Sequence, residues 1–425
     1  MNYQETLDYL FLKLPMFQRV GDQAFKKDLT NTIRLLESLG NPHKTFKSIH
    51  IAGTNGKGSL THILASCLQE NGLKVACYTS PHYKDFRERI KINGALVSEA
   101  YIIDFVERVK PLIEEIEPSF FEITVAMAFD YFAKEKVDVA VIETGMGGRF
   151  DSTNVLTPLL SIITNISYDH QQFLGDTLEK IGFEKAGIIK DEVPVLIGEY
   201  QKEIEDVFTD KAMQMSSSMF YAHELFKIAD YDSSFEGSKF STFFGKRKIF
   251  YSTDLAGPFQ KKNLQTAMAA FVLLKEEFDL SDEAIRRGLE NIRTNTYFLG
   301  RCMKLQDNPL VIVDSAHNEA GIKELNDIVK SIAYKKLYFV YGTVTDKDLS
   351  KIIPILPAKA SYYFCKADIP RGMDAEKLST AAQSLGLTGQ HYPSVQDAYK
   401  SALKDASAED LVVVSGSIFV VAEVI

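Results

Sequence analysis

The residues best able to do chemistry form one short segment, Gly53, Thr54, Asn55, Gly56, Lys57, Gly58 and Ser59. Three glycines within six positions let backbone N–H groups turn inward around phosphate oxygens, and Lys57 adds a mobile positive charge. An apolar run at 49–52 precedes the segment and a helical pattern at 60–68 follows it. The N-terminus of a helix favours an anion, so we predict a phosphate-binding loop for a nucleoside triphosphate. The alternative is a glycine-rich turn between a strand and a helix, with one exposed lysine.

Polar side chains also follow three predicted strands. Glu143 ends the apolar run at 137–142, Ser80 follows the strand at 74–78, and His170 follows the strand at 160–166. The carboxyl ends of parallel strands meet at one edge of a sheet, where ligands bind. Glu143 could therefore ligate the Mg²⁺ carried by ATP, or it could cap the turn that follows its strand. His170 could be a ligand or a structural histidine, and its spacing alone does not decide between these two roles.

Several other polar residues are ambiguous from composition. Lys185 lies in a helical stretch, where it would be interpreted as a solvated lysine, and the run Asp314 to Asn318 follows a strand, where it is compatible with turn chemistry. A basic stretch after Ser80 could hold carboxylates of a substrate or be a solvated charged loop. Its cations are Lys84, Arg87, Arg89 and Lys91.

The elements that must position these residues alternate along the chain. Helical spacing comes first, at 5–14 and 25–39, and after the loop β-rich runs alternate with helical stretches, which is typical of a parallel sheet covered by helices. These runs and stretches lie at 74–78, 99–117, 121–134, 137–143 and 159–166. From about 218 to 257, short alternating runs rich in Phe and Tyr predict a small antiparallel appendage. Helices at 261–278 and 281–293 lead to a second series, with strands at 310–314, 337–341, 362–365 and 411–415.

The predicted fold is therefore α/β with two domains, as expected for 425 residues. Residues 1–296 form an ATP-binding domain with a phosphate-binding loop, a mainly parallel sheet and the antiparallel appendage. Residues 297–425 form a smaller Rossmann-like α/β domain.

Composition excludes several classes of protein. The net charge of −9 argues against extended nucleic-acid binding, and no apolar stretch approaches the roughly 20 residues of a membrane span. The N-terminus lacks a basic region followed by an apolar one, so we expect a cytoplasmic protein without a membrane partner. The cysteines have no Cys-x-x-Cys spacing and are predicted to be small core residues rather than zinc ligands or disulfides. They are Cys67, Cys77, Cys302 and Cys365.

Over nearly its whole length, the chain resembles the folylpolyglutamate synthase and dihydrofolate synthase family of the Mur ligase superfamily. The strings that carry the resemblance are LGNP at 39–42, IAGTNGKGS at 51–59, TSPH at 79–82, ETGMGGRFDSTN at 143–154, DHQQFLG at 169–175, EKAGIIK at 184–190, GR at 300–301, DSAHN at 314–318 and TDKD at 345–348. Two strings depart from the family: Phe259 and Gln260 replace a His-Gln pair, and Ser315 and Glu319 depart from Asp-Gly-Ala-His-Asn-Pro.

The resemblance implies a role for each site residue. Ser80, Glu143 and His170 correspond to Mg²⁺ ligands, and Lys185 corresponds to a carbamylated lysine that supports a second Mg²⁺. Lys57, Lys185 and His170 are the implied catalytic residues, and 54–59 hold the triphosphate of ATP. The implied nucleotide contacts are Asn263, Arg301, Asp314 and His317, and the implied pterin-binding residues are Phe121, Glu122, Phe150, Asp151 and Ser152.

The implied activity is ATP-dependent addition of L-glutamate to dihydropteroate or to the glutamate tail of reduced folates, through an acyl phosphate, by a monomer. One alternative is a Mur-type ligase that joins an amino acid to a UDP-muramoyl substrate. Another is a nucleotide-dependent switch without ligase activity. The N-terminal helices lead directly into the loop, which favours the folate branch, because Mur enzymes of peptidoglycan synthesis generally begin with a separate UDP-binding domain.

Overall fold

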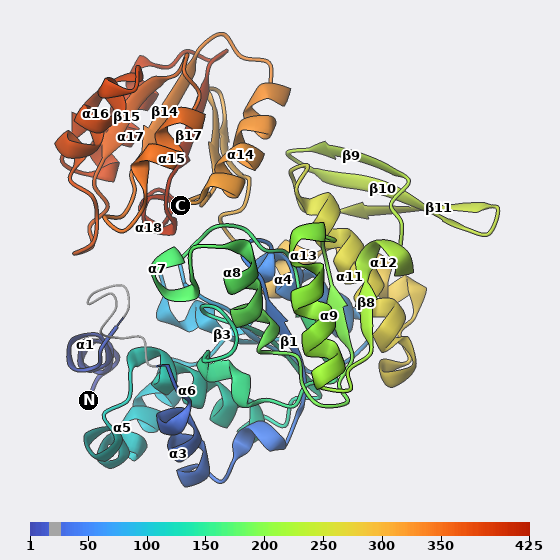
Figure 1. The fold of residues 1–425 in the computed structure, drawn as a ribbon. Helices are drawn as coiled ribbons and strands as arrows, with labels where there is room; N and C mark the ends of the chain where they lie inside the picture. The colour runs from blue at the N-terminus through green and yellow to red at the C-terminus, as the bar shows by residue number, and fades with distance from the viewer. Residues whose placement is uncertain (17–26) are drawn as a thin grey trace. The chain divides into compact units, whose positions relative to one another are not determined.

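The computed structural model describes residues 1–16 and 27–425, which divide into two compact units (Figure 1). The first unit comprises 1–232, 239–254 and 260–298, and the second comprises 233–238, 255–259 and 299–425. The division at 298/299 lies near the boundary predicted at 296/297. The two short segments that join the second unit were not foreseen.

The first unit is built on an eight-stranded sheet with the order β4-β3-β2-β5-β1-β6-β7-β8. Its centre is β1 (Lys47–Ala52), which pairs in parallel with β5 (Val139–Glu143) and β6 (Leu160–Ile163). Apolar residues dominate these strands because both faces of the sheet are covered. The remaining strands are β2 (Val75–Tyr78), β3 (Ile90–Ile92), β4 (Ala95–Leu96), β7 (Val195–Ile197) and β8 (Met219–Tyr221).

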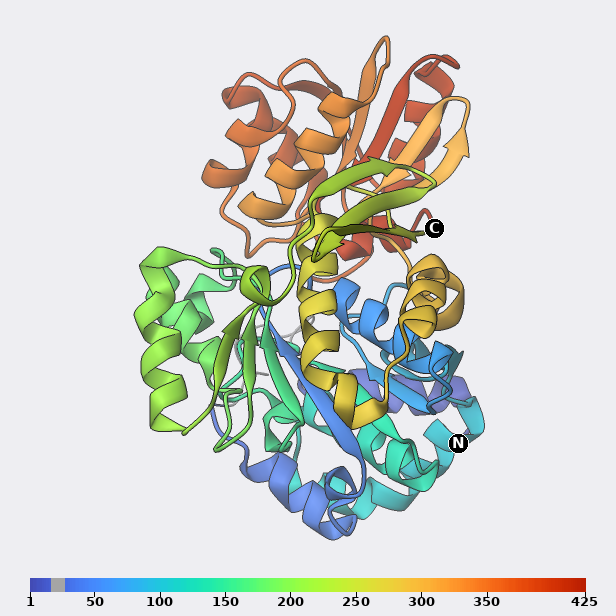
Figure 2. The ribbon, with the colours of Figure 1, turned by 90° about the vertical axis from the view of Figure 1, so that its right-hand side faces the viewer.

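Helices surround this sheet and build separate parts of the core. One apolar cluster joins β2 and β5 to α1 (Tyr3–Lys13), α3 (Thr30–Ser38), α5 (Glu99–Ile116) and α6 (Phe120–Lys134). A second cluster joins β6 and β7 to α8 (Leu178–Ala186) and α9 (Glu205–Gln214). Figure 2 shows α4 (Lys57–Glu70) beside α11 (Gln260–Phe278), and α12 (Asp282–Glu290) packs on α4 as well. The short helices are α7 (Gln171–Leu174), α10 (Ala222–Leu225) and α13 (Ile292–Thr296).

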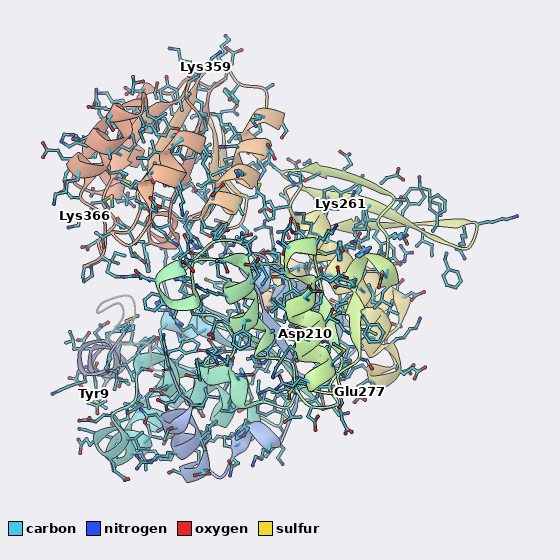
Figure 3. The ribbon with its side chains drawn as sticks, viewed as in Figure 1. Tyr9, Asp210, Lys261, Glu277, Lys359 and Lys366 are labelled. Atoms are coloured by element: carbon cyan, nitrogen blue, oxygen red, sulfur yellow. The ribbon has the colours of Figure 1, made fainter. Side chains whose placement is uncertain are left out.

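Local sequence explains where the helices near the site begin. Ser119 accepts a hydrogen bond from the backbone N–H of Glu122, and the Glu122 carboxylate accepts one from the N–H of Ser119, so α6 starts at a capping box. Figure 3 shows charged side chains such as Asp210 and Glu277 at the surface of the first unit, as expected for exposed helix faces.

The predicted appendage is an antiparallel sheet with the order β11-β10-β9. Its strands are β9 (Asp230–Ser234), β10 (Gly237–Phe244) and β11 (Arg247–Thr253). The appendage is shorter than the predicted range of 218–257, because 219–221 instead form β8, which pairs in parallel with β7 at the edge of the main sheet. A short run of β-forming residues does not reveal which sheet it joins.

The second unit has a six-stranded sheet with the order β12-β13-β17-β14-β15-β16, in which only the β12–β13 pair is antiparallel. Its strands are β12 (Met303–Asp307), β13 (Leu310–Val313), β14 (Leu337–Tyr341), β15 (Ser361–Cys365), β16 (Thr388–Tyr392) and β17 (Leu411–Ser415). Its helices are α14 (Glu319–Ser331), α15 (Leu349–Ile352), α16 (Ala375–Ser384), α17 (Val395–Asp405) and α18 (Ile418–Ala422). The predicted fold class is confirmed.

The sequence also predicted buried cysteines and the absence of a membrane-spanning segment. All four cysteines are free and buried, which confirms that they are core residues. Among the helices of residues 1–16 and 27–425, none is both long and apolar enough to cross a membrane.

Burial of His50 in β1 makes a prediction about acid stability. Its Nε2 lies 2.8 Å from Thr153 Oγ1, and its burial, with nearby Lys190 as the smaller cause, lowers its pKa to about 3. In the unfolded chain the pKa of this histidine is about 6.5, so below that pH the unfolded chain binds a proton that the folded chain excludes. The free energy of unfolding is therefore unaffected by His50 above pH 6.5 and falls as the pH drops from there towards 3.

We therefore expect the unfolding free energy of the wild type to fall faster below about pH 6.5 than that of His50→Gln, by up to about 1.4 kcal/mol per pH unit. Denaturant midpoints across this range measure the two slopes. His391→Gln, which alters an exposed histidine, is the control and should match the wild type. Parallel slopes for wild type and His50→Gln would contradict the assignment.

Candidate functional site

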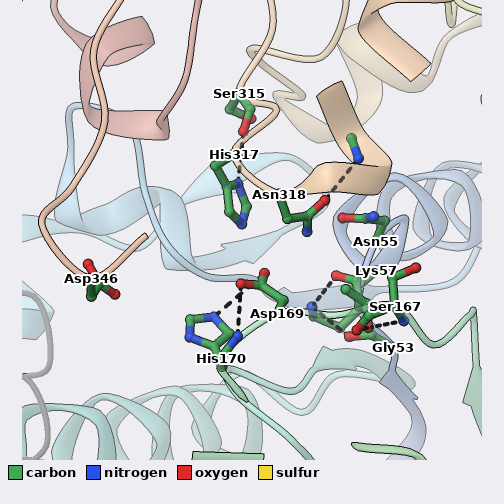
Figure 4. Close-up of polar contacts among 12 residues, drawn as sticks. Gly53, Asn55, Lys57, Ser167, Asp169, His170, Ser315, His317, Asn318 and Asp346 are labelled. Atoms are coloured by element: carbon green, nitrogen blue, oxygen red, sulfur yellow. Dashed lines mark hydrogen bonds and ion pairs between the residues drawn. The ribbon is translucent and has the colours of Figure 1, made fainter. Parts of the chain in front are cut away.

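The glycine-rich loop lies between β1 and α4, and its lysine folds back onto it. Lys57 is the first residue of α4, and its Nζ donates to the carbonyl oxygens of Gly53, at 3.0 Å, and Thr54, at 3.2 Å (Figure 4). The ammonium group is therefore held over the loop by two backbone oxygens. A phosphate oxygen is a stronger, charged acceptor, so this contact places the lysine ready for exchange onto an anion.

The segment that follows β6 fixes the shape of the loop. The N–H of Thr54 donates to the carbonyl oxygen of Asn165 at 2.9 Å, and the N–H of Asn55 donates to Asn165 Oδ1 at 3.1 Å. Thr164 Oγ1 donates to the carbonyl oxygen of Asn55 at 2.6 Å. Gly53 has φ +148°, and a Cβ there would lie 1.8 Å from Thr164 Oγ1, so this position needs glycine. Thr164 and Asn165 were not among the site residues predicted from sequence, because their position after a strand was the only signal.

Asn263, an implied nucleotide contact, lies against the loop. It is in the first turn of α11, where its Nδ2 donates to Gln260 Oε1 at 2.8 Å, and Gln260 Nε2 donates to Ser59 Oγ at 3.4 Å. Gly56 has φ +84°, and a Cβ there would lie 2.3 Å from Asn263 Oδ1. The start of α11 and the start of α4 are therefore coupled through these amides.

Two of the three implied metal ligands are brought together. The N–H of Ser80 donates to Glu143 Oε2 at 3.3 Å, and the buried Glu143 ends β5. A Cβ on Gly58 would lie 3.7 Å from Glu143 Oε2, so the carboxylate faces the first turn of α4. His170 stands on another segment, where its ring faces Asp169, with Nε2 3.9 Å from Oδ2 (Figure 4).

Lys185 is buried, so the solvated lysine expected from its composition is wrong. Its Nζ donates to the carbonyl oxygen of Gly53 at 2.9 Å, the same oxygen that receives Lys57. Burial, and then the nearby charge of Lys57, lower the pKa of Lys185 to about 7. Two amines thus converge on one loop carbonyl, and one of them is neutral much more readily than an ordinary lysine.

Close backbone contacts bring Lys185 to the glycine-rich loop. The N–H of Arg149 donates to the carbonyl oxygen of Glu184 at 2.8 Å. A Cβ on Gly148 would lie 2.9 Å from the carbonyl oxygens of Glu184 and Lys185, and one on Gly187 would lie 2.4 Å from Arg149 Cα. The loop after β5 and the end of α8 can approach this closely only because both contact positions are glycine. Neither glycine was identified as a site residue from sequence.

Two of the implied pterin-binding residues, Asp151 and Phe121, contact the loop after β5. Asp151 organises it, because Oδ2 accepts from the N–H groups of Gly145 and Met146, at 2.8 and 2.9 Å, and Oδ1 accepts from Thr153. Phe121 covers Gly145, where a Cβ would lie 2.5 Å from the ring.

The other three residues of this set have different surroundings. The ring of Phe150 stacks under the Arg149 guanidinium at 4.3 Å, Ser152 is buried, and Glu122 caps α6. Phe121 and Phe150 thus present partly exposed rings, whereas Asp151 and Glu122 are engaged in holding backbone.

The remaining implied nucleotide contacts cluster within the second unit. Asp314 follows β13, and its carboxylate accepts from the N–H groups of Cys302 and Ala316, both at 2.8 Å. Burial raises the pKa of Asp314, and the positive charge of Arg301 opposes that shift. His317 Nδ1 lies 2.9 Å from the carbonyl oxygen of Ser315 (Figure 4).

Comparisons with known proteins agree with this arrangement. Residues 51–271 match the model of the Mur ligase middle domain, and residues 300–418 match that of the Mur ligase glutamate ligase domain. The dihydrofolate synthase/folylpolyglutamate synthase of Bacillus subtilis is 34% identical over 412 residues, which cover 94% of each chain. The folylpolyglutamate synthase of Lacticaseibacillus casei is 32% identical, over 100% of this chain and 98% of its own.

Solved structures show the same similarity. The folylpolyglutamate synthase of Mycobacterium tuberculosis complexed with ADP and AMPPCP superposes with a TM-score of 0.87 and 28% identity, over 99% of this chain and 98% of that one. The Escherichia coli protein FolC in complex with DHPP and ADP gives a TM-score of 0.84 and 28% identity, over 100% and 97% of the two chains.

The contact between Gly56 and Asn263 can be tested with a matched pair of glycines. Gly56→Ala and Gly72→Ala both place a side chain at positive φ, +84° and +88°, but nothing lies within 4 Å of the Cβ at position 72. Both variants should lose about 1–2 kcal/mol of stability from backbone strain. Only Gly56→Ala should weaken binding of a fluorescent ATP analogue, by about tenfold or more, because Asn263 must move. Equal affinities would show that this contact does not shape the nucleotide site.

Proposed function

Since the chain belongs to the folylpolyglutamate synthase and dihydrofolate synthase family of Mur ligases, we propose that it adds L-glutamate to dihydropteroate or to the glutamate tail of reduced folates. The observation that most supports this is the ammonium group of Lys57, which the carbonyl oxygens of Gly53 and Thr54 hold over the glycine-rich loop. A ligase that forms an acyl phosphate needs concentrated positive charge at a phosphate loop, and it needs no nucleophilic side chain.

The proposed reaction has two steps. The substrate carboxylate attacks the γ-phosphorus of ATP, the bond to the β-phosphate oxygen breaks, and an acyl phosphate and ADP form. The amine of L-glutamate then attacks the acyl carbon, phosphate leaves with the C–O bond electrons, and the amine loses a proton to give the amide. Lys57 moves from the backbone oxygens to the β- and γ-phosphates and offsets the charge that develops there.

The residues present fit a Mg²⁺ ion that arrives with the nucleotide. Within the described residues, no group of three or more His, Cys, Asp or Glu side chains could hold a metal by itself. Mg²⁺ is commonly held by one or two carboxylates together with phosphate oxygens and waters, and Glu143 offers such a carboxylate facing the start of α4. We propose Glu143 and Ser80 as its protein ligands, with His170 joining them. Bound there, Mg²⁺ would offset negative charge on the phosphates.

The position of Lys185 supports its proposed carbamylation. Its amine is buried, its pKa is lowered to about 7, and a second lysine lies beside it. The neutral amine adds to CO₂, an N–C bond forms, and one proton is released to leave a carbamate anion. That anion would replace repulsion between two ammonium groups with attraction and could support a second Mg²⁺.

Two cations of the stretch after Ser80 are buried rather than solvated. Arg89 and Lys91 are 3% exposed, so for them the solvated alternative is wrong. Arg89 Nε donates to His82 Nδ1 at 2.8 Å, and its guanidinium lies 5.4 Å from the centre of the Phe120 ring. Arg87, by contrast, pairs with Asp85 at 2.6 Å. We propose that Arg89 holds a carboxylate of the folate or of its glutamate tail.

We also propose that the enzyme acts as a cytoplasmic monomer.

The substrate class is tested by ADP formation from ATP across a panel of acids. We expect turnover only when a pteroate or folate and L-glutamate are both present, because the acyl phosphate needs one and the amide needs the other. Omitting each in turn is the control. Turnover with a UDP-muramoyl acid instead of the pterins would assign the chain to peptidoglycan synthesis. Turnover that responds only to a protein partner would indicate a switch.

The role of Lys185 is tested by removing its side chain. Lys185→Ala should lose at least about 99% of turnover, as expected when a preorganised electrostatic contact is lost. Added acetate should restore part of it by supplying a carboxylate in the vacated space. Lys180→Ala, an exposed lysine of the same helix, is the matched control. A metal-loaded crystal that shows unmodified Lys185 in an ion pair would refute carbamylation.

A further inference from the structure

The end of the β10–β11 hairpin carries a surface patch that the proposed reaction does not use. Phe243, Phe244 and Phe250 are 58%, 79% and 64% exposed. Lys246, Arg247 and Lys248 are exposed among them. We call these six residues the hairpin tip. In Figure 1 this end of the hairpin projects beyond the other elements of the first unit. Three such phenylalanines within eight residues form an apolar patch of the kind that marks an interaction site.

The tip is apolar and basic on both of its faces. A two-residue turn, Gly245 and Lys246, joins the strands, so Phe244 lies opposite Arg247 and Phe243 lies opposite Lys248. The stacked pair Phe240 and Tyr251, with ring centres 5.0 Å apart, fits this register. Consecutive strand residues point to opposite faces, so Phe243 and Phe244 cannot both be covered by one flat surface.

Charge at the tip is opposite to that of the whole chain. The chain carries 57 acidic residues and a net charge of −9, yet Gly237 to Thr253 contain no Asp or Glu. Lys248 pairs with Asp230 at 2.5 Å and lies 5.8 and 5.4 Å from the ring centres of Phe243 and Phe250. Lys246 and Arg247 extend the positive surface to the turn.

We propose that the hairpin tip binds the surface of an anionic lipid bilayer. Aromatic rings flanked by Lys and Arg are suited to the boundary between headgroups and acyl chains, and each cation adds attraction to anionic lipid. The fluid interface can surround both faces of the ribbon, whereas a second copy of this chain would have to supply a groove around it. We expected no membrane partner because the chain has no apolar stretch long enough to span a bilayer, but a surface patch can bind a bilayer without a spanning segment.

The chain contains no tryptophan, so Phe244→Trp makes the tip its only tryptophan fluorophore. We expect a blue shift of its emission with vesicles of phosphatidylglycerol and phosphatidylcholine, little change with phosphatidylcholine alone, and weaker binding as salt rises. An unshifted spectrum with the anionic vesicles at low salt would overturn the proposal.

Co-sedimentation with the same vesicles tests the unlabelled chain. Phe243→Ser/Phe244→Ser should abolish binding, and Lys246→Gln/Arg247→Gln should weaken it about fivefold for each cation removed. Met213→Ser and Lys330→Gln, which alter side chains 68% and 75% exposed elsewhere, are the matched controls and should bind as the wild type does. Equal binding by tip and control variants would refute the proposal. So would concentration-dependent dimers that the tip variants abolish while vesicle binding persists.

Discussion

The carbonyl oxygen of Gly53 is the point on which the site in the first unit depends. It accepts hydrogen bonds from Lys57 at 3.0 Å and from Lys185 at 2.9 Å, so it brings two amines to one point of the loop. Burial, and then the nearby charge of Lys57, lower the pKa of Lys185 to about 7, so Lys185 loses its proton much more readily than an ordinary lysine does. We infer that this arrangement favours an anion beside Lys57 and a neutral amine or a carbamate at Lys185.

Glycine contacts keep that oxygen and both lysines in place. Gly53 touches Thr164, and Gly148 and Gly187 bring the loop after β5 against the end of α8. A Cβ atom at any of these positions would lie closer to neighbouring atoms than real Cβ atoms do. Asp151 then fixes the same loop through the N–H groups of Gly145 and Met146. Rigid, close-packed backbone is how this fold holds the charged groups before any substrate binds.

Sequence predicted the features that depend on local pattern. The strand–loop–helix around 53–59, the strands ending at Glu143 and Tyr341 and the core cysteines follow from periodicity and residue type. The burial of Lys185 could not be predicted, because it is created by contacts with Gly53, 132 positions earlier in the chain. The prediction that assigned 219–221 to the appendage was wrong for the same reason, because pairing with β7 places them in the main sheet as β8. Asp151 is a different case, because the N–H groups that it holds lie only two to six positions away, and the sequence did not show which of them the folded loop turns towards its carboxylate.

We infer that the backbone oxygens of Gly53 and Thr54 hold Lys57 only until a phosphate replaces them. The ATP-dependent turnover of Lys57→Ala, compared with that of Lys180→Ala, whose lysine is exposed, tests this exchange. We predict a loss of at least about a hundredfold for Lys57→Ala with an unchanged fold, as for removal of a preorganised charge. Turnover equal to that of Lys180→Ala in a well-folded protein would show that Lys57 does not act on the phosphates.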